Sequence, residues 1–451
     1  MVLSLRCVFI IKNIGCRMAE KVFTFVSQIV AAVLLMLVTT VQAQVKITVL
    51  SDTHVMGPGL VVKDGPAWQQ VVATDRKMHE YSCRIMEGVT DKALADKTDL
   101  LLICGDLTKD GELLSHQFVV SQLDRLREKG VKSFVIPGNH DLGTRKALFY
   151  DGNGTRPAPV ADAAQFAKLY QNYGYGPESQ RDSASLSYCC EPVEGLVLIG
   201  IDSGKKGILA EPTVRWACRQ AGEATKQGKR VLAMMHHSLL NHFNREGELM
   251  PSTVVNDWQD IRNRLADAGI EVVLTGHFHV SDIAKDYNAD MSRTIYDIST
   301  GSLTTYPCDY RQMMLSADRS QLDIKTVRLA NQPDNQEFGR KAKERMINSS
   351  KAFARSIINH DMVASIAAAA LVIFAEGNED ASEEAREYLD TYEFGKAFLT
   401  GNARVQKILE DRGFSLSDID AIIYSILTDR SSYGIKGRED KTDDLTLTIK
   451  F

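Results

Sequence analysis

The sequence lacks most of the features that mark specialised classes of protein. Its 53 basic residues do not outnumber its 58 acidic ones, the net charge is −5, and no basic stripe stands out. Specific binding of nucleic acid is therefore not expected. None of the eight cysteines belongs to a CxxC pair, which disfavours a zinc ribbon. Internal repeats and low-complexity tracts are missing too, so the 451 residues resemble an ordinary globular protein.

One long uncharged stretch is present, near the N-terminus. Residues 22–45 carry no charge, their centre reads IVAAVLLMLV, and VQA at 41–43 supplies small residues at the usual cleavage spacing. We predict a secretory signal peptide over 1–43, with 1–17 as an upstream extension if translation starts at Met18. The alternative is an uncleaved membrane anchor, but the strongly apolar part is nearer half the length of a membrane span. We expect an exported protein, periplasmic or extracellular, with no stable membrane insertion after cleavage.

Short apolar runs alternate with amphipathic segments along the first part of the chain. The segments 112–130 and 252–269 repeat apolar residues at helical spacing and end in glycine, which is typical of helices. The apolar runs are rich in Val, Ile and Leu, as strands buried on both faces are. Their alternation with helices predicts an α/β fold. The runs are 45–50, 99–104, 131–137, 195–201, 230–235 and 270–275.

The pattern changes after residue 280. Segments 293–299, 311–317 and 321–329 look like strands without helices between them, which predicts a second, more antiparallel sheet packed on the first. Polar residues at 330–337 then mark a boundary. We therefore expect a catalytic domain over 44–332 and a mainly helical accessory region over 333–451, which ends in a strand-like segment.

Polar clusters follow five of the apolar runs. Open α/β sheets build their binding sites at the carboxyl ends of strands, so these clusters are expected to meet at one edge. Glycine precedes three of them, which allows sharp turns and close approach of the backbone. The clusters are Asp52-Thr53-His54, Gly105-Asp106, Gly138-Asn139-His140-Asp141, His236-His237 and Gly276-His277-Phe278-His279.

Carboxylate, amide and imidazole groups in this arrangement predict metal binding. A single histidine of this kind is more often structural, but five ordered clusters, each after a strand, favour a shared site. Strand alternation predicts that Asp52 and His54 point the same way, and likewise His277 and His279. Seven ligands are too many for one ion and suit two, with Asp106 as the bridge, and mixed ligands favour Mn, Fe or Zn. The seven are Asp52, His54, Asp106, Asn139, His236, His277 and His279.

The five clusters resemble the calcineurin-like metallophosphoesterase superfamily, whose pattern is D-x-H, G-D, G-N-H-[DE], a later H and G-H-x-H. The resemblance implies an α/β sandwich in four layers, with two packed central β-sheets flanked by helices and a dimetal site at their edge. It also implies the seven ligands named above, with His236 rather than His237 as the ligand. By the same likeness His140 is the catalytic histidine at the leaving oxygen, and Asp141 orients it.

Departures from related patterns narrow the expected activity. Iron-tyrosinate acid phosphatases have tyrosine where this chain has Lys109, and the G-D-x-V-D-R-G pattern of serine/threonine phosphatases is missing. We expect a dinuclear-metal hydrolase of phosphomonoesters or small phosphodiesters, with metal-bound hydroxide as nucleophile. A nucleotidase or nuclease of the same fold is one alternative, although the acidic balance weakens binding of long polymers. A catalytically inactive exported binding protein is the other. The sequence leaves the oligomeric state open.

Overall fold

The computed structural model describes residues 43–329, 336–358, 361–377, 403–411, 413–427 and 443–451, together with a few single positions between 383 and 401. The expected signal peptide lies outside the described residues except for Ala43, and so does most of the polar boundary at 330–337. Residues Gln44–Phe451 form one unit. Among the described helices, none is both long and apolar enough to cross a membrane.

Strands make up most of the centre of this unit. They are β1 (Val45–Leu50), β2 (Leu100–Ile103), β3 (Lys132–Val135), β4 (Leu148–Tyr150), β5 (Thr155–Pro157), β6 (Gln180–Arg181), β7 (Tyr188–Val193), β8 (Leu196–Ile201), β9 (Arg230–Met235), β10 (Val272–Thr275), β11 (Asp282–Tyr287), β12 (Thr294–Ser299), β13 (Asp309–Leu315), β14 (Gln321–Arg328) and β15 (Thr446–Lys450).

Helices connect and flank these strands. They are α2 (Pro66–Thr74), the short 3₁₀ helix η1 (His79–Tyr81), α3 (Ser82–Ala95), α4 (Leu113–Glu128), α5 (Ala163–Leu169), α6 (Glu211–Lys226), α7 (Glu246–Leu249), α8 (Trp258–Asp267), α9 (Gln336–Ile358), α10 (Asp361–Glu376), α12 (Ala403–Glu410) and α13 (Leu416–Leu427).

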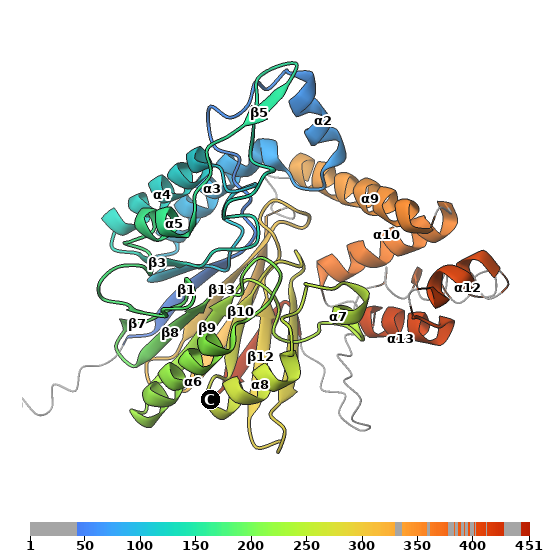
Figure 1. Ribbon diagram of the computed structural model, residues 1–451. Helices are drawn as coiled ribbons and strands as arrows, with labels where there is room; N and C mark the ends of the chain where they lie inside the picture. Colours follow the sequence, from blue (N-terminus) through green and yellow to red (C-terminus); the bar gives the residue numbers. More distant parts are fainter. Residues whose placement is uncertain are drawn as a thin grey trace, which may run out of the picture. The chain divides into compact units, whose positions relative to one another are not determined.

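Two large sheets pack against each other around the main apolar core (Figure 1). The six-stranded sheet has the order β15-β14-β13-β1-β2-β3, and the seven-stranded sheet has the order β11-β12-β10-β9-β8-β7-β6. Helices α3 and α4 lie against the β1–β3 part of the first sheet, and α6 and α8 lie against the second. The expected fold class, two central sheets flanked by helices, is therefore confirmed.

The strands that precede the polar clusters run parallel within each sheet. β1, β2 and β3 are parallel neighbours in the first sheet, and β8, β9 and β10 are parallel neighbours in the second. Parallel neighbours bring their carboxyl ends to the same edge, and an isolated bridge between Ser51 and Ser302 joins the end of β1 to the loop after β12. The five clusters are therefore delivered to one place from both sheets.

Two expectations about the elements were wrong. The strands after residue 280 do not form a sheet of their own: β12 pairs in parallel with β10 in the second sheet, whereas β13 pairs antiparallel with β1 in the first. The helix expected over 252–269 begins only at Trp258. Its first part forms turns around a single bridge to Ser238: Val255 N–H donates to Ser238 O, and Asp257 takes a left-handed φ of 47° just before the helix starts.

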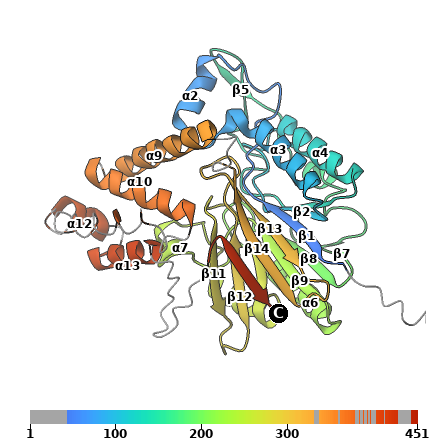
Figure 2. The same ribbon diagram turned by 180° about the vertical axis from the view of Figure 1, so that it is seen from behind.

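The C-terminal helices pack on the loops that leave the sheets. A second apolar cluster joins α9, α10 and α13 to Met78, Phe243, Phe278 and Tyr306. After these helices the chain returns to the first sheet, where β15 pairs antiparallel with β14, as Figure 2 shows from behind. The last strand of the region expected as an accessory segment is thus part of the central sheet. The boundary proposed at 332 stays a prediction.

Candidate metal centre

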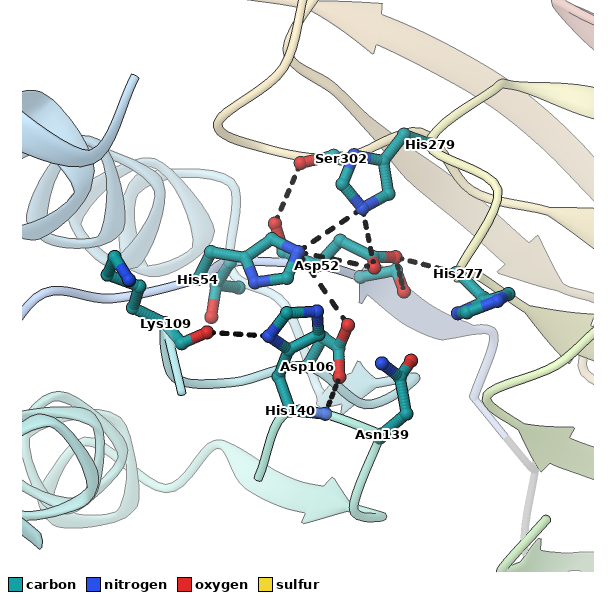
Figure 3. Close-up of polar contacts among 12 residues, drawn as sticks. Asp52, His54, Asp106, Lys109, Asn139, His140, His277, His279 and Ser302 are labelled. Atoms are coloured by element: carbon teal, nitrogen blue, oxygen red, sulfur yellow. Dashed lines mark hydrogen bonds and ion pairs between the residues drawn. The ribbon is translucent and has the colours of Figure 1, made fainter. Parts of the chain in front are cut away.

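The five clusters meet at the carboxyl ends of β1, β2, β3, β9 and β10. Figure 3 shows residues of the four clusters after β1, β2, β3 and β10. Their backbone is not the extended exit that alternation assumes, because most of these positions have left-handed φ angles. Such angles are uncommon for residues other than glycine and mark positions that the surrounding structure holds in place. They are 50° at Asp52, 38° at His54, 49° at Asp106, 69° at His277 and 67° at His279.

Glycines allow the clusters to approach one another. Gly105 has a φ of 88°, and a Cβ there would lie 2.6 Å from Nδ1 of His236. At Gly276 a Cβ would lie 1.7 Å from Oγ of Ser51 and 2.6 Å from Oδ2 of Asp52. Any larger residue at these two positions would therefore push the strand ends apart.

A first group of potential ligands consists of Asp52, His54 and His279. Nε2 of His279 lies 3.1 Å and Nε2 of His54 lies 3.6 Å from Oδ1 of Asp52, and the two nitrogens are 3.2 Å apart. All three side chains are buried. His279 comes from the second sheet and the other two from the first, so this group bridges the sheets.

A second group consists of Asp106, His236 and His277. Nε2 of His236 lies 3.3 Å from Oδ2 of Asp106 and 3.2 Å from Nδ1 of His277. Oδ1 of Asn139 lies 3.0 Å from the same Nε2. The structure thus brings all seven predicted ligands together, but the two histidines of the G-H-x-H block belong to different groups. The expectation that His277 and His279 point the same way was wrong, because the two side chains join different ligand groups.

Asp106 lies between the two groups. Its Oδ2 is 3.3 Å from His236 of the second group and 3.7 Å from His54 of the first. Oδ1 accepts a hydrogen bond of 2.8 Å from the backbone N–H of His140, which fixes the carboxylate plane. This is the position that a carboxylate shared by two metal ions would occupy.

The charges of the cluster suit cations. Burial alone would raise the pKa of Asp52 and of Asp106, but neighbouring histidines hold both carboxyls well below their usual range. Burial lowers the pKa of His277 to about 3 and that of His279 to about 4. Both imidazoles are therefore neutral near pH 7, the form in which a ring nitrogen binds a metal.

Neighbouring groups orient these ligands. Nδ1 of His236 donates to the carbonyl of Cys104 at 2.8 Å, and Nδ1 of His279 is 3.0 Å from Oγ1 of Thr305, so each ring turns its Nε2 inward. Oδ2 of Asp52 accepts from the hydroxyl of Ser51 and the N–H of His277, whereas its buried Oδ1 has no hydrogen-bond partner among the described residues. An unpartnered carboxylate oxygen between two imidazole nitrogens fits a bound cation.

His140 lies beside the two groups, with its ring 5.0 Å from that of His54. Its Nδ1 donates to the carbonyl of Lys109 at 2.8 Å and to Oδ1 of Asp110 at 2.9 Å. Burial would lower the pKa of His140, but the hydrogen bond to Asp110 and the charge of Asp106 raise it above its usual value. The ring is thereby held in one orientation, with Nε2 left for a ligand.

The residue that orients this ring is Asp110 and not Asp141, so that part of the prediction was wrong. The Asp141 carboxylate accepts hydrogen bonds from the N–H groups of Leu107, Thr108 and Gly138. It ties the loop after β2 to the loop after β3, and none of its hydrogen bonds among the described residues goes to the ring of His140. Asp110 was missed because it lies four residues beyond Asp106, outside the G-D pair, although GDLTKDG displays it.

His237, the neighbour of His236, supports the centre from outside both groups. Its Nδ1 is 2.7 Å from Oγ of Ser203, and its ring lies 4.3 Å from that of His277 at 41°. The ring of His237 therefore packs against that of His277. Of the two adjacent histidines, His236 is the one that belongs to a ligand group.

The loop after β12 contributes contacts that the sequence did not indicate. Oγ of Ser302 donates to the carbonyl of Asp52 at 2.8 Å, and Oγ1 of Thr304 donates to the same oxygen at 3.4 Å. Thr305 contacts His279 as described. A run of hydroxyl residues directly after a strand, TGSLTT, was the available signal.

A comparison with models of protein families agrees with the motifs. The family model described as calcineurin-like phosphoesterase matches residues 45–281. No curated protein shows a significant match to the sequence. A dimetal phosphatase from Danio rerio has 11% identity and a TM-score of 0.43, covering 62% of this chain and 95% of that one. A purple acid phosphatase from yellow lupin seeds has 10% identity and a TM-score of 0.39, covering 64% and 52%. A sulfate thiohydrolase from Thermus thermophilus has 10% identity and a TM-score of 0.31, covering 68% and 61%.

Proposed function

The chain belongs to the calcineurin-like phosphoesterase family, and on this premise we propose that it hydrolyses small phosphate esters with the help of two transition-metal ions. The observation that carries the proposal is the pair of ligand groups that share Asp106. Mixed imidazole, carboxylate and amide donors suit Mn, Fe or Zn. The first ion would be held by Asp52, His54 and His279, the second by His236, His277 and Asn139, with Asp106 between them.

When bound, such a pair neutralises the charge of the phosphoryl oxygens and supplies an activated water as nucleophile. The residues of the chain would position the substrate and supply a proton. The buried carboxylates and rings fix where the phosphoryl group lies and exclude bulk water from it. His140 presents Nε2 toward the centre and carries a proton more readily than a free imidazole, because Asp110 accepts from Nδ1. It is suited to give that proton to the leaving oxygen.

The first test combines metal content with kinetics on two esters. We expect about two metal ions per chain in reconstituted protein. His140→Ala should keep both ions and lose about 10²–10⁴-fold in turnover of an alkyl phosphate, the usual contribution of a positioned acid. It should lose much less on 4-nitrophenyl phosphate, whose leaving group needs no proton. Asp106→Ala should lose metal and activity on both esters, because a bridging carboxylate offsets the repulsion of two close cations.

Asp110→Asn is the matched control for Asp106→Ala. It removes a carboxylate from the same loop but leaves every ligand in place, so metal content should stay at the wild-type value while the alkyl ester is selectively affected. Two metal ions and full activity in Asp106→Ala would refute the proposal. An equal loss on both esters in His140→Ala would remove His140 from the leaving-group role.

A further inference from the structure

Two adjacent cations, Arg76 and Lys77, lie between α2 and η1 next to the metal centre. Both side chains are partly buried. Among the described residues neither side chain has an ion pair or a hydrogen bond, and the adjacent carboxylate, Asp75, is engaged with Nε2 of His79 at 3.0 Å. A partly desolvated cation without a partner is unfavourable, so such a pair is poised to bind an anion.

The segment that carries these cations is fixed to the site. The N–H of Met78 donates to the carbonyl of Thr304 at 2.6 Å, in the loop that also supports Asp52 and His279. Nδ1 of His79 lies 3.4 Å from the carbonyl of His54, and the two rings are 6.2 Å apart. The segment therefore has a defined position relative to the metal ligands.

Helix α9 fixes the segment from the other side. Arg345 donates to both carboxylate oxygens of Glu80, at 2.7 and 3.0 Å, and to the carbonyl of Lys77 at 3.2 Å. Figures 1 and 2 both show α9 beside the segment that leads into α3. A bidentate arginine–carboxylate pair restrains both direction and distance. The C-terminal helices thus take part in holding the cations beside the centre.

The charges of the two residues act on the site unevenly. Lys77 is second only to burial in lowering the pKa of His54, and it opposes the rise in the pKa of His140. Its charge also lies near Asp106 and Asp110. Arg76 acts on Asp52, and both cations add to the effect of burial in lowering the pKa of His279. The geometry agrees: the segment contacts His54 through His79, and the ring of His54 lies 5.0 Å from that of His140.

We propose that Arg76 and Lys77 bind a second anionic group of the substrate, carried by its leaving group. The substrates would then be phosphoesters whose leaving group bears a carboxylate or another phosphate. This inference rests on the proposed function, because His140 defines the leaving-group side. The two metal ions, when bound, would take the oxygens of the scissile phosphate, so Arg76 and Lys77 would be available for a charge elsewhere on the substrate. Arg345 and Glu80 act as positioning residues for both.

The experiment measures binding of phosphonates, which the enzyme cannot hydrolyse, to metal-loaded protein by calorimetry. The probes are phenylphosphonate, 3-carboxyphenylphosphonate and 1,3-benzenediphosphonate. Two of these probes carry a second anionic group, a carboxylate or a second phosphonate. Wild-type protein should bind at least one of these two about tenfold or more tightly than phenylphosphonate, as expected for a charge-assisted contact. The tighter of the two identifies the second anion as carboxylate or phosphate.

Variants separate this role from general attraction. Arg76→Ala and Lys77→Ala should each lose most of the preference and keep the affinity for phenylphosphonate, whereas Lys77→Arg should retain it. Arg345→Gln should weaken the preference at unchanged metal content. Arg84→Ala and Lys129→Ala, which remove exposed cations from α3 and from the end of α4, serve as controls and should leave the preference intact.

Equal affinity of the wild type for all three probes would overturn the inference, and so would parallel losses on every probe in Lys77→Ala, which would place the lysine on the scissile phosphate. The proposed function fails differently. A protein that shows the preference but hydrolyses no ester would refute hydrolysis alone, and one that hydrolyses esters without the preference would refute only the second anion site.

Discussion

His116, on α4, is a buried histidine that packs behind the metal centre. Its Nε2 donates to the carbonyl of Asp141 at 3.0 Å, its Nδ1 is 2.9 Å from the hydroxyl of Tyr170, and its ring meets that of Phe166 edge-on at 5.6 Å. Burial lowers its pKa to about 4. The residue therefore stays neutral in the folded protein at pH values where an unfolded chain would protonate it.

The sign of the pH effect follows from that difference. Between about pH 6.5 and pH 4 the unfolded chain binds more protons at this position than the folded chain, so stability falls as pH falls through this window. The loss from this residue should reach about 3 kcal/mol and level off below pH 4. We expect His116→Gln, which keeps one donor and one acceptor, to show a shallower decline in the free energy of unfolding. Denaturant titrations at a series of pH values test this, and identical slopes would show that His116 does not titrate on unfolding.

At the scale of elements, one arginine joins five strands or strand ends. Arg311 on β13 is fully buried. It donates to Oγ1 of Thr326 on β14 and to the carbonyl of Asp444 just before β15. Its other nitrogen donates to the carbonyls of Ser299 at the end of β12 and Asp282 at the start of β11, at 2.6 and 3.3 Å. The guanidinium thus ties the two sheets and the C-terminal strand together.

Arg311→Met would approximately keep the volume of this side chain but remove the four hydrogen bonds that its guanidinium donates. We expect a loss of about 3–5 kcal/mol in the free energy of unfolding, the range for breaking buried charged networks. Lys325→Met on β14 removes an exposed cation from the same sheet and should change stability by less than about 0.5 kcal/mol. Equal denaturation midpoints for the two variants would show that the hydrogen bonds of Arg311 make no net contribution to the free energy of unfolding.

At the scale of the whole molecule, export stays a prediction from the sequence. Cleavage after Ala43 would leave the first strand whole, because β1 begins at Val45. We predict that the mature protein begins at or near Gln44. N-terminal sequencing of protein from cell fractions tests this, with a variant in which Ala43→Phe blocks the cleavage position as the control. An intact Met1 or Met18 terminus on membrane-bound protein would favour the uncleaved anchor.

Local pattern was enough for several features of this protein. The six apolar runs became β1, β2, β3, β8, β9 and β10 with bounds shifted by no more than two residues, because strands buried on both faces need continuous apolar sequence. The polar clusters lay at the carboxyl ends of five of these strands, as the sequence pattern predicted. The family and its two-sheet architecture followed from these clusters, and the seven predicted ligands were brought together.

Tertiary structure decided the rest. Which histidines share a group depends on backbone turns at His277 and His279 and on contacts across the two sheets, such as the hydrogen bond from the N–H of His277 to Asp52. The hydrogen bond between His140 and Asp110 joins the loops after two different strands. The placement of β12 in one sheet and β13 in the other also depends on tertiary contacts. A linear sequence records which side chains follow each strand. The distances between side chains on different loops are set only when the strands and sheets pack together.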